Sequence, residues 1–317
     1  MILSRGRGLI LAAVAGLAMA LVALPGGSRP AAAQAVTTLT YQFPGGNRTV
    51  LVTDFSRGRP APLVIVLHGA EGSADQIRRY LTWDVIGKRE GLLVVYPQGV
   101  RGGWNDGRPA DGRRFNPLAR VDDVGFIRNM VADLNTKGRI DRRRVYVVGV
   151  SAGGHMVNRL ICEASDLFAA AAPLLATLAV RWSFHCAGQP LPVLLVNGTE
   201  DPITPWGGRS GGVDPDSALA SVNATFAFFR NRNGCASAGD RPLPEQETSD
   251  NSRVHLVEGT GCHHAARLYR VEGGGHHTPT GLERRQRPPI GALLGQQNHD
   301  IETDEEIWIF FADKRRP

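Results

Sequence analysis

Two kinds of hydrophobic pattern alternate along the chain. Short runs of almost entirely apolar residues recur, and such runs are typical of strands that are buried on both faces of a parallel sheet. Between them lie longer segments in which apolar residues return every three or four positions, as along one face of a helix. Because strands that alternate with helices build layered α/β folds, the pattern predicts a mostly parallel central sheet with helices on both faces.

The boundaries of these elements follow from the same pattern. Strands are predicted at 36–43, 48–54, 62–67, 92–96, 144–149, 168–174, 193–197, 254–257 and 266–271. Helices are predicted at 74–90, 122–135, 152–162, 217–231 and 302–312. The segment 97–121 is rich in Gly, Arg, Asp and Pro and has no periodicity, so we expect a long loop with a functional role.

The N-terminal segment has the composition of a secretory signal peptide. Arg5 and Arg7 precede the apolar run 9–24, and small residues follow at Ala31–Ala35. The run is shorter than the roughly 20 residues that a membrane-spanning helix needs. We therefore predict a signal peptide at residues 1–33, cleaved after Ala33 or Ala35, and a single catalytic domain at 36–317. The mature protein is expected to be secreted or periplasmic, with no stable membrane anchor.

Charge and cysteine content narrow the class of protein further. Without the three arginines of the predicted signal peptide, 33 basic residues face 30 acidic ones, and this weak balance gives no support for nucleic-acid binding. An even number of cysteines in an exported protein favours disulfides. The short spacings favour the pairs Cys162–Cys186 and Cys235–Cys262. No Cys-x-x-Cys pair is present, so we expect neither a zinc site nor a redox site.

A candidate nucleophile lies between a predicted strand and a predicted helix. The residues Gly149–Gly153 match the pattern Gly-x-Ser-x-Gly, in which a sharp turn aims the serine oxygen above the end of the sheet. The apolar strand before the motif and the helix after it supply the setting that this turn requires. Ser151 is therefore the predicted nucleophile, and the start of the helix adds positive potential for a developing oxyanion.

A serine nucleophile needs a base, and the base needs an acid that orients it. In folds with this turn, the chain order is serine, acid and histidine. Asp201 follows the buried strand 193–197, at the end of a strand where catalytic groups gather. Glu200 is a neighbouring alternative, but Pro202 fixes the turn directly after Asp201. Asp201 is the predicted acid.

The predicted base is His276. It follows the last predicted strand through the glycines 273–275, which place a side chain at a tight turn beyond the sheet. His299 is the alternative base. A metal site built from the pairs 263–264 and 276–277 is disfavoured, because adjacent histidines rarely supply two ligands to one ion and no Asp or Cys completes the set. The predicted chemistry requires no metal and no cofactor.

The oxyanion hole is predicted from two backbone amides. One is the amide of the residue after the nucleophile, Ala152, and the other lies in the loop that follows the first buried strand. That loop begins at His68, and Gly69 allows a close approach of its backbone, so Ala70 is the second predicted donor. His68 itself is expected to order the loop rather than to act as a base.

These motifs, taken together, resemble a known family. In chain order they are Leu67–Gly69, Tyr96–Gly99, Gly103–Asn105, Asp122–Ile127, Gly149–Met156, Gly198–Trp206 and Gly273–His276. The series is similar to the secreted poly(3-hydroxybutyrate) depolymerase and feruloyl esterase family of serine esterases with the α/β-hydrolase fold. The resemblance covers nearly all of the mature chain, and it implies that Ser151, Asp201 and His276 form a catalytic triad and that the cysteines are paired.

The sequence departs from the family pattern at two places. Many members have a cysteine where this chain has Ala70, and members usually have an aromatic-Pro-Gly run where this chain has His277–Gly281. The predicted loops also carry Trp104, Asn105 and Trp206, which could line an acyl pocket, although each tryptophan could equally belong to the core. The predicted substrates are small or polymeric esters of feruloyl, acetyl or 3-hydroxybutyryl groups. A serine peptidase and a non-catalytic binding protein on the same scaffold are the alternatives.

Overall fold

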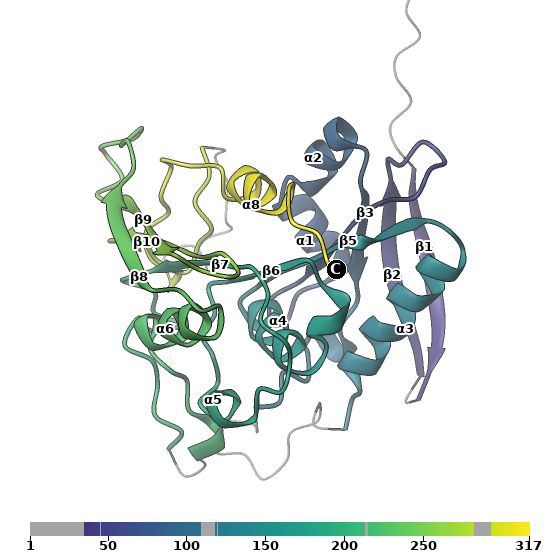
Figure 1. Ribbon diagram of the computed structural model, residues 1–317, viewed down its shortest axis with the longest axis horizontal. Helices are drawn as coiled ribbons and strands as arrows, with labels where there is room; N and C mark the ends of the chain where they lie inside the picture. Colours follow the sequence, from purple (N-terminus) through teal and green to yellow (C-terminus); the bar gives the residue numbers. More distant parts are fainter. Residues whose placement is uncertain (1–34, 45, 109–117, 119, 213–214, 282–292) are drawn as a thin grey trace, which may run out of the picture. The chain divides into compact units, whose positions relative to one another are not determined.

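A ten-stranded sheet forms the centre of the protein (Figure 1). The computed structural model describes residues 35–44, 46–108, 118, 120–212, 215–281 and 293–317. The predicted signal peptide at residues 1–33 lies outside the described residues. In the sheet the strands follow the order β1-β2-β4-β3-β5-β6-β7-β10-β9-β8. The strands are β1 Val36–Phe43, β2 Gly46–Asp54, β3 Ala61–Leu67, β4 Leu93–Pro97, β5 Ile140–Val150, β6 Ala170–Leu174, β7 Val193–Gly198, β8 Ser237–Pro242, β9 Arg253–Thr260 and β10 Ala266–Glu272.

The middle of the sheet is parallel and its two edges are antiparallel. All neighbours from β4 through β3, β5, β6 and β7 to β10 run parallel. The pairs β1–β2, β2–β4, β10–β9 and β9–β8 run antiparallel. Every residue of β3, β4, β6 and β7 is buried, as expected for strands covered on both faces. The predicted fold class, a mostly parallel α/β sheet, is confirmed.

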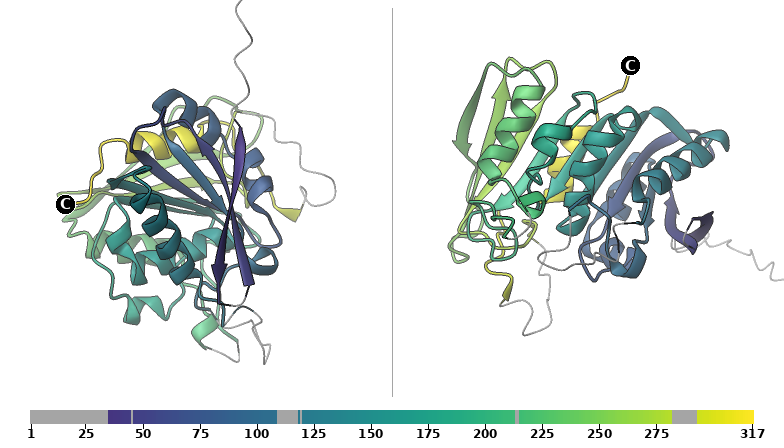
Figure 2. Two further views of the ribbon diagram at one scale, coloured as in Figure 1. Left: turned by 90° about the vertical axis from the view of Figure 1, so that its right-hand side faces the viewer. Right: turned by 90° about the horizontal axis from the view of Figure 1, so that it is seen from below.

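Helices cover both faces of the sheet (Figure 1, Figure 2). They are α1 Ala74–Tyr80, α2 Trp83–Glu90, α3 Asp123–Thr136, α4 Ala152–Glu163, α5 Trp182–His185, α6 Val222–Arg232 and α8 Thr303–Phe311. Successive side chains of β3 enter different cores because a strand alternates its faces: Ile65 packs with α3, α4 and α6, whereas Val64 packs with α1, α2 and α8. Within the described ranges, no helix is long and apolar enough to cross a membrane.

Two predicted helices need correction, and one strand was not predicted. The helix predicted at 74–90 is two helices, because the carboxylate of Asp304 accepts hydrogen bonds from the Thr82 amide (2.6 Å) and hydroxyl (2.9 Å) and breaks the helix there. The helix predicted from 217 begins only at Val222, after Ser221 caps it through the amide of Ala224. Strand β8 was missed, because this edge strand is exposed and carries no apolar run.

Both predicted disulfides are present. Cys162, in the last turn of α4, is bonded to Cys186, which directly follows α5. Cys235, which follows α6, is bonded to Cys262 between β9 and β10. Each bond closes a short loop, with sequence separations of 24 and 27 residues. The pairing predicted from the spacing is confirmed.

Candidate active site

Ser151 occupies a strained turn between β5 and α4. Its φ is 57° and its ψ is −117°, a backbone conformation that costs energy for any residue with a side chain. The amide of Ser151 donates to the carbonyl of Leu174 at the end of β6 (2.9 Å), which ties the turn to the neighbouring strand. The turn thus holds the serine at the carboxyl end of the parallel strands, as the motif predicts.

The glycines of the motif allow the backbone to pack closely around this turn. A Cβ atom added at Gly149 would lie 2.2 Å from the carbonyl oxygen of Gly153. A Cβ atom at Gly153 would lie 2.4 Å from the carbonyl oxygen of Leu67, in the strand next to β5. Real Cβ atoms do not approach backbone oxygens so closely, so these positions require glycine.

The predicted acid and base are in direct contact. Nδ1 of His276 lies 2.7 Å from Oδ2 of Asp201, and both residues are buried, with exposures of 8% and 4%. The other carboxylate oxygen, Oδ1, accepts hydrogen bonds from the amides of Ile203 (2.8 Å) and Thr204 (2.7 Å). Because the carboxylate is held from both sides, the His276 ring has a fixed orientation, with Nδ1 as the donor and Nε2 left to accept a proton.

The alternatives to this pair lie elsewhere. Glu200 is exposed, whereas Asp201 is buried at the imidazole. Nδ1 of His299 lies 2.7 Å from the carbonyl oxygen of Thr280, with no bond to the acid of the pair. The structure therefore joins His276, and not His299, to Asp201.

The acid loop and the nucleophile turn meet on the segment that follows β6. The Ser151 amide donates to Leu174, and the hydroxyl of Thr204, in the acid loop, donates to the next carbonyl, that of Leu175 (3.1 Å). Among the described residues, the Ser151 side chain has no hydrogen-bond partner, and catalytic hydrogen bonds often tighten only when a substrate binds.

The first loop lies against the nucleophile turn. A Cβ atom at Gly69 would be 3.6 Å from Cβ of Ser151, so the loop backbone runs directly beside the serine. Within the described chain, neither the amide of Ala70 nor that of Ala152 donates to another residue. Two unpaired amides beside the serine are what an oxyanion hole requires.

His68 orders this loop. Its Nδ1 donates to the carbonyl of Gly69 (2.8 Å), and its Nε2 accepts from the amide of Gly99 (3.0 Å). Burial lowers the pKa of the imidazole, which is consistent with the neutral form that these two hydrogen bonds require. The ordering role predicted for His68 agrees with these contacts.

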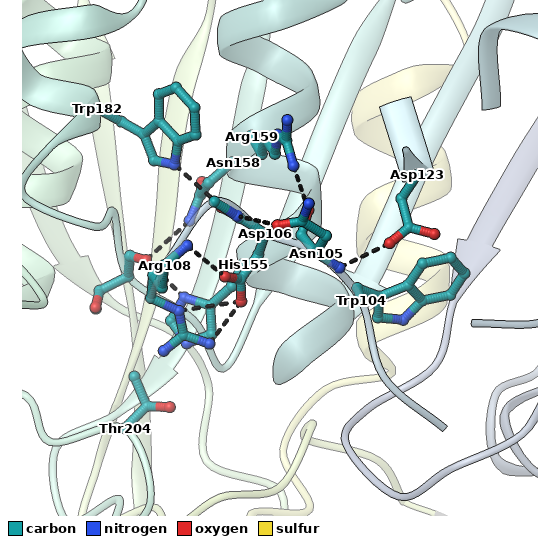
Figure 3. A network of polar contacts seen from close by, with 12 residues as sticks. Trp104, Asn105, Asp106, Arg108, Asp123, His155, Asn158, Arg159, Trp182 and Thr204 are labelled. Atoms are coloured by element: carbon teal, nitrogen blue, oxygen red, sulfur yellow. Dashed lines mark hydrogen bonds and ion pairs between the residues drawn. The ribbon is translucent and has the colours of Figure 1, made fainter. Parts of the chain in front are cut away.

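Trp104 and Asn105 lie behind the loop. Their exposures are 5% and 8%. The indole of Trp104 donates to the carbonyl of His68 (2.9 Å). The amide of Asn105 donates to the Asp123 carboxylate (2.7 Å) (Figure 3). Trp206 is half-buried, in the loop that also carries the acid. Of the three predicted pocket residues, only Trp206 has substantial exposed surface.

A polar wall, which sequence patterns did not reveal, supports this side of the site. We define it as Asp106, Arg108, Asp123 and Arg159 with the segment 104–108 that they hold (Figure 3). Asp106 accepts from Nε (3.0 Å) and Nη2 (2.6 Å) of Arg108, and Arg159 donates to the carbonyl of Asn105 (2.7 Å). Asp106 and Arg108 lie in an irregular loop without periodicity, and Asp123 and Arg159 lie on helices distant in sequence, so the only sequence signal was the unusual length of the loop. In the described residues, no group of three or more His, Cys, Asp or Glu side chains could hold a metal ion.

Comparison with known proteins gives the same class of protein as the fold. Residues 56–204 match the family described as "Esterase PHB depolymerase". The chain is 29% identical to a putative esterase, NocK, of Nocardia uniformis subsp. tsuyamanensis, over 82% of this chain and 79% of that protein. It is 29% identical to feruloyl esterase B of Piromyces equi and 28% identical to poly(3-hydroxyalkanoate) depolymerase C of Paucimonas lemoignei, each over 74% of this chain. The chain spans only 41% and 59% of the lengths of these two relatives.

Among solved structures, the acetyl xylan esterase from Aspergillus awamori superposes with a TM-score of 0.52, at 13% identity, over 77% of this chain and 95% of that one. This likeness shows the fold. Fold and relatives together define an α/β-hydrolase that cleaves ester bonds. The chain is similar to this esterase family, whose relatives here include a feruloyl esterase and a poly(3-hydroxyalkanoate) depolymerase.

Proposed function

We propose that the protein is an exported serine esterase that forms an acyl-enzyme on Ser151. The observation that supports this most is the 2.7 Å contact between His276 and Asp201, at the same edge of the sheet as the strained serine turn. The three residues also occur in the chain order typical of this fold. In this proposal Ser151 is the nucleophile, His276 the base and Asp201 the orienting acid.

The mechanism follows from these positions. Ser151 Oγ attacks the ester carbonyl, and its proton passes to Nε2 of His276. The negative charge on the carbonyl oxygen is stabilised by the amides of Ala70 and Ala152. The tetrahedral intermediate collapses, and His276 returns the proton to the departing alkoxide. Water then attacks the acyl-enzyme by the same route in reverse order and releases the acid, while Asp201 stays ionised and stabilises the imidazolium.

The substrates we propose are carboxylic esters of feruloyl, acetyl or 3-hydroxybutyryl groups, small or polymeric. The names of the relatives, a feruloyl esterase and a poly(3-hydroxyalkanoate) depolymerase, support this range. Trp206 lies in the acid loop with exposed surface and is the proposed contact for the acyl group. Trp104 and Asn105 are buried, and we propose that they hold the oxyanion loop in place instead.

Hydrolysis of p-nitrophenyl butyrate tests the proposal. The wild type should release p-nitrophenol, and Ser151→Ala should lower kcat by about 10⁴-fold or more, because the nucleophile is lost. Ser237→Ala is the matched control: this serine lies on the exposed edge strand β8, where its hydroxyl contacts Thr260, and its loss should leave the rate unchanged. Full activity in Ser151→Ala, or none in the wild type, would refute the esterase. The relative rates of hydrolysis of methyl ferulate, acetylated xylan and hydroxybutyrate oligomers then show which acyl group the enzyme prefers.

Export is part of the same proposal. The predicted signal peptide and two disulfides, which persist in oxidising compartments, support it. N-terminal sequencing of the exported protein should find Gln34 or Val36 as the first residue. A product that retains the apolar run 9–24 would contradict cleavage.

A further inference from the structure

Two hollows lie at the edge of the sheet opposite the proposed active site. The first has a volume of about 550 Å³ and lies between the loop that leads into β3, the end of α2 and Arg144 of β5. The second, of about 470 Å³, lies where the chain enters β6, β7 and β10. Both are therefore at the amino ends of parallel strands, whereas the proposed triad follows their carboxyl ends. Strands of five to seven residues separate the two edges by roughly 20 Å.

Arginines dominate the charge of the first hollow. Its charged lining consists of one glutamate and four arginines, namely Glu90, Arg57, Arg59, Arg89 and Arg144. Arg89 forms ion pairs with Glu90 and Glu305, which neutralise it. Within the described chain, the exposed guanidinium groups of Arg57 and Arg59 have neither a hydrogen bond nor an ion pair. The hollow therefore offers two fork-shaped groups of donors to an anion.

The segment that follows α8 connects the second hollow to the first. The Arg316 amide donates to the Arg143 carbonyl (2.9 Å), and Nε of Arg143 donates to the Arg316 carbonyl (3.0 Å). This segment thus lies beside β5 (Figure 1), next to Arg144 of the first hollow. Lys314–Arg316 all line the second hollow. We call the band of basic residues that joins the two hollows the basic edge: Arg57, Arg59, Arg143, Arg144 and Lys314–Arg316.

The nearly balanced charge of the whole chain conceals this concentration. Beyond residue 33 the chain has 33 basic and 30 acidic residues, but the linings of the two hollows hold seven arginines and lysines against two acidic residues, Glu90 and Asp313. Positive charges that are gathered on one face repel one another and attract a polyanion. The basic edge is therefore suited to a ligand with several negative charges along its length.

The linings favour a polysaccharide among polyanions. Prolines in both hollows, Pro60 in the first and Pro190 and Pro192 in the second, offer apolar surface to the faces of sugar rings, and the Glu90 carboxylate can accept hydrogen bonds from sugar hydroxyls. Single-stranded nucleic acids stack on exposed aromatic side chains. The described residues of the linings include no Tyr or Trp, and their phenylalanines, Phe55 and Phe168, are buried. A flat lipid surface does not reach into hollows.

We propose that the basic edge binds an acidic polysaccharide, a chain of sugars that bear carboxylate groups. Arg57 and Arg59 pair with carboxylates in the first hollow, because the planar guanidinium matches a carboxylate with two parallel hydrogen bonds. Lys314–Arg316 hold a further part of the same chain at the second hollow. Since both hollows lie at the edge opposite Ser151, the bound polymer leaves the proposed active site open. The inference goes beyond the proposed esterase activity and does not require it.

Binding to polygalacturonate tests the proposal. The Kd of the exported protein for the immobilised polymer is measured by biolayer interferometry at about 0.1 M salt, where surface charges still attract one another over about 10 Å. Arg57→Glu/Arg59→Glu should raise the Kd by about tenfold or more, because two groups that bind carboxylates become repulsive. A neutral galactan should not bind to either protein. The matched control is Arg120→Glu/Arg241→Glu, which changes the net charge equally at two exposed arginines outside the hollows, and its Kd should stay within about threefold of the wild type.

The inference is overturned if the wild type does not bind polygalacturonate, or if the two double variants have equal Kd values. It is also overturned if vesicles of phosphatidylglycerol or single-stranded DNA bind more tightly than the polymer. Saturating polygalacturonate should leave the KM for p-nitrophenyl butyrate unchanged, and a raised KM would place the polymer at the edge of the proposed triad instead. If Arg57→Glu/Arg59→Glu does not fold, Arg59→Gln replaces it, with an expected rise in Kd of about threefold. A wild type without esterase activity would refute the proposed function but would leave this binding test intact.

Discussion

The nucleophile turn and the polar wall, two regions that flank the proposed oxyanion hole, are held in place by opposite means. At the turn, Gly149 and Gly153 let backbone atoms approach to distances that no side chain would permit. At the wall, buried charged groups do the work: Asp123 is fully buried and joins Nη2 of Arg48 (2.6 Å) to the amide of Asn105 (2.7 Å). The turn requires residues without side chains, whereas the wall requires charged side chains.

The difference predicts how each region responds to change. A side-chain atom added at the turn meets backbone, which cannot move without shifting β5 or α4. The turn therefore does not tolerate larger side chains. Removal of a charged group at the wall leaves a buried charge without its partner. The wall therefore does not tolerate truncation of its charged side chains. Since both regions flank the same serine, either failure should reduce esterase activity along with stability.

The largest effect is expected at the wall. Asp123→Ala leaves the buried guanidinium of Arg48 unpaired, and the free energy of unfolding should fall by about 3–5 kcal/mol in urea denaturation. Asp166→Ala is the control, since it also removes an aspartate that contacts an arginine, Arg128, but in an exposed pair. Its cost should be about 1 kcal/mol or less. Equal losses of unfolding free energy in the two variants would show that burial does not determine how much the Arg48–Asp123 pair stabilises the protein.

The two regions also differ in how far the sequence predicts them. The residue types that the turn requires lie within Gly149–Gly154, so a local motif and the adjacent apolar strand were sufficient to place it. The contact between Arg48 and Asp123 joins positions 75 residues apart, and no local pattern records it. The helix predicted at 122–135 begins with both Asp122 and Asp123, and nothing local distinguishes their roles. The structure assigns the capping role to Asp122, which accepts from the Gly125 amide (2.8 Å).

The same distinction between local and distant contacts explains which elements of the fold could be predicted from the sequence. The buried strands β3, β4 and β7 were predicted within one or two residues, because an apolar run between loops is a local signal. The break between α1 and α2 was not predicted, because Asp304, which binds Thr82, lies 222 residues further along the chain. At the site, chain order together with positions at strand ends and turns selected Asp201 and His276, which the structure brings into contact. The burial of Trp104 depends on tertiary contacts and could not be inferred.

A smaller effect is expected at the turn. Gly149→Ala places a Cβ atom 2.2 Å from the Gly153 carbonyl oxygen, and we expect the unfolding free energy to fall by about 1–3 kcal/mol as β5 and α4 separate. Gly207→Ala is the matched control, because a Cβ atom there meets nothing within 4 Å. Its change should stay within about 0.5 kcal/mol. If Gly149→Ala is as stable as Gly207→Ala, close backbone packing is not what holds the turn.

The smallest effect concerns His155, which follows the turn on α4 and is electrostatically coupled to Arg108 of the wall. Its pKa is lowered in the folded protein, mainly by burial, so the unfolded chain binds a proton first as pH falls below about 6.5. The stability that His155 contributes is therefore fully present above pH 6.5 and is lost towards lower pH, by at most about 1.4 kcal/mol per pH unit. His155→Leu removes this loss. The stability difference between wild type and His155→Leu, measured by urea denaturation at pH 7.5 and 5.5, should shift against the wild type at the lower pH. A difference that is equal at both pH values would show that the ring is not held neutral where the turn and the wall meet.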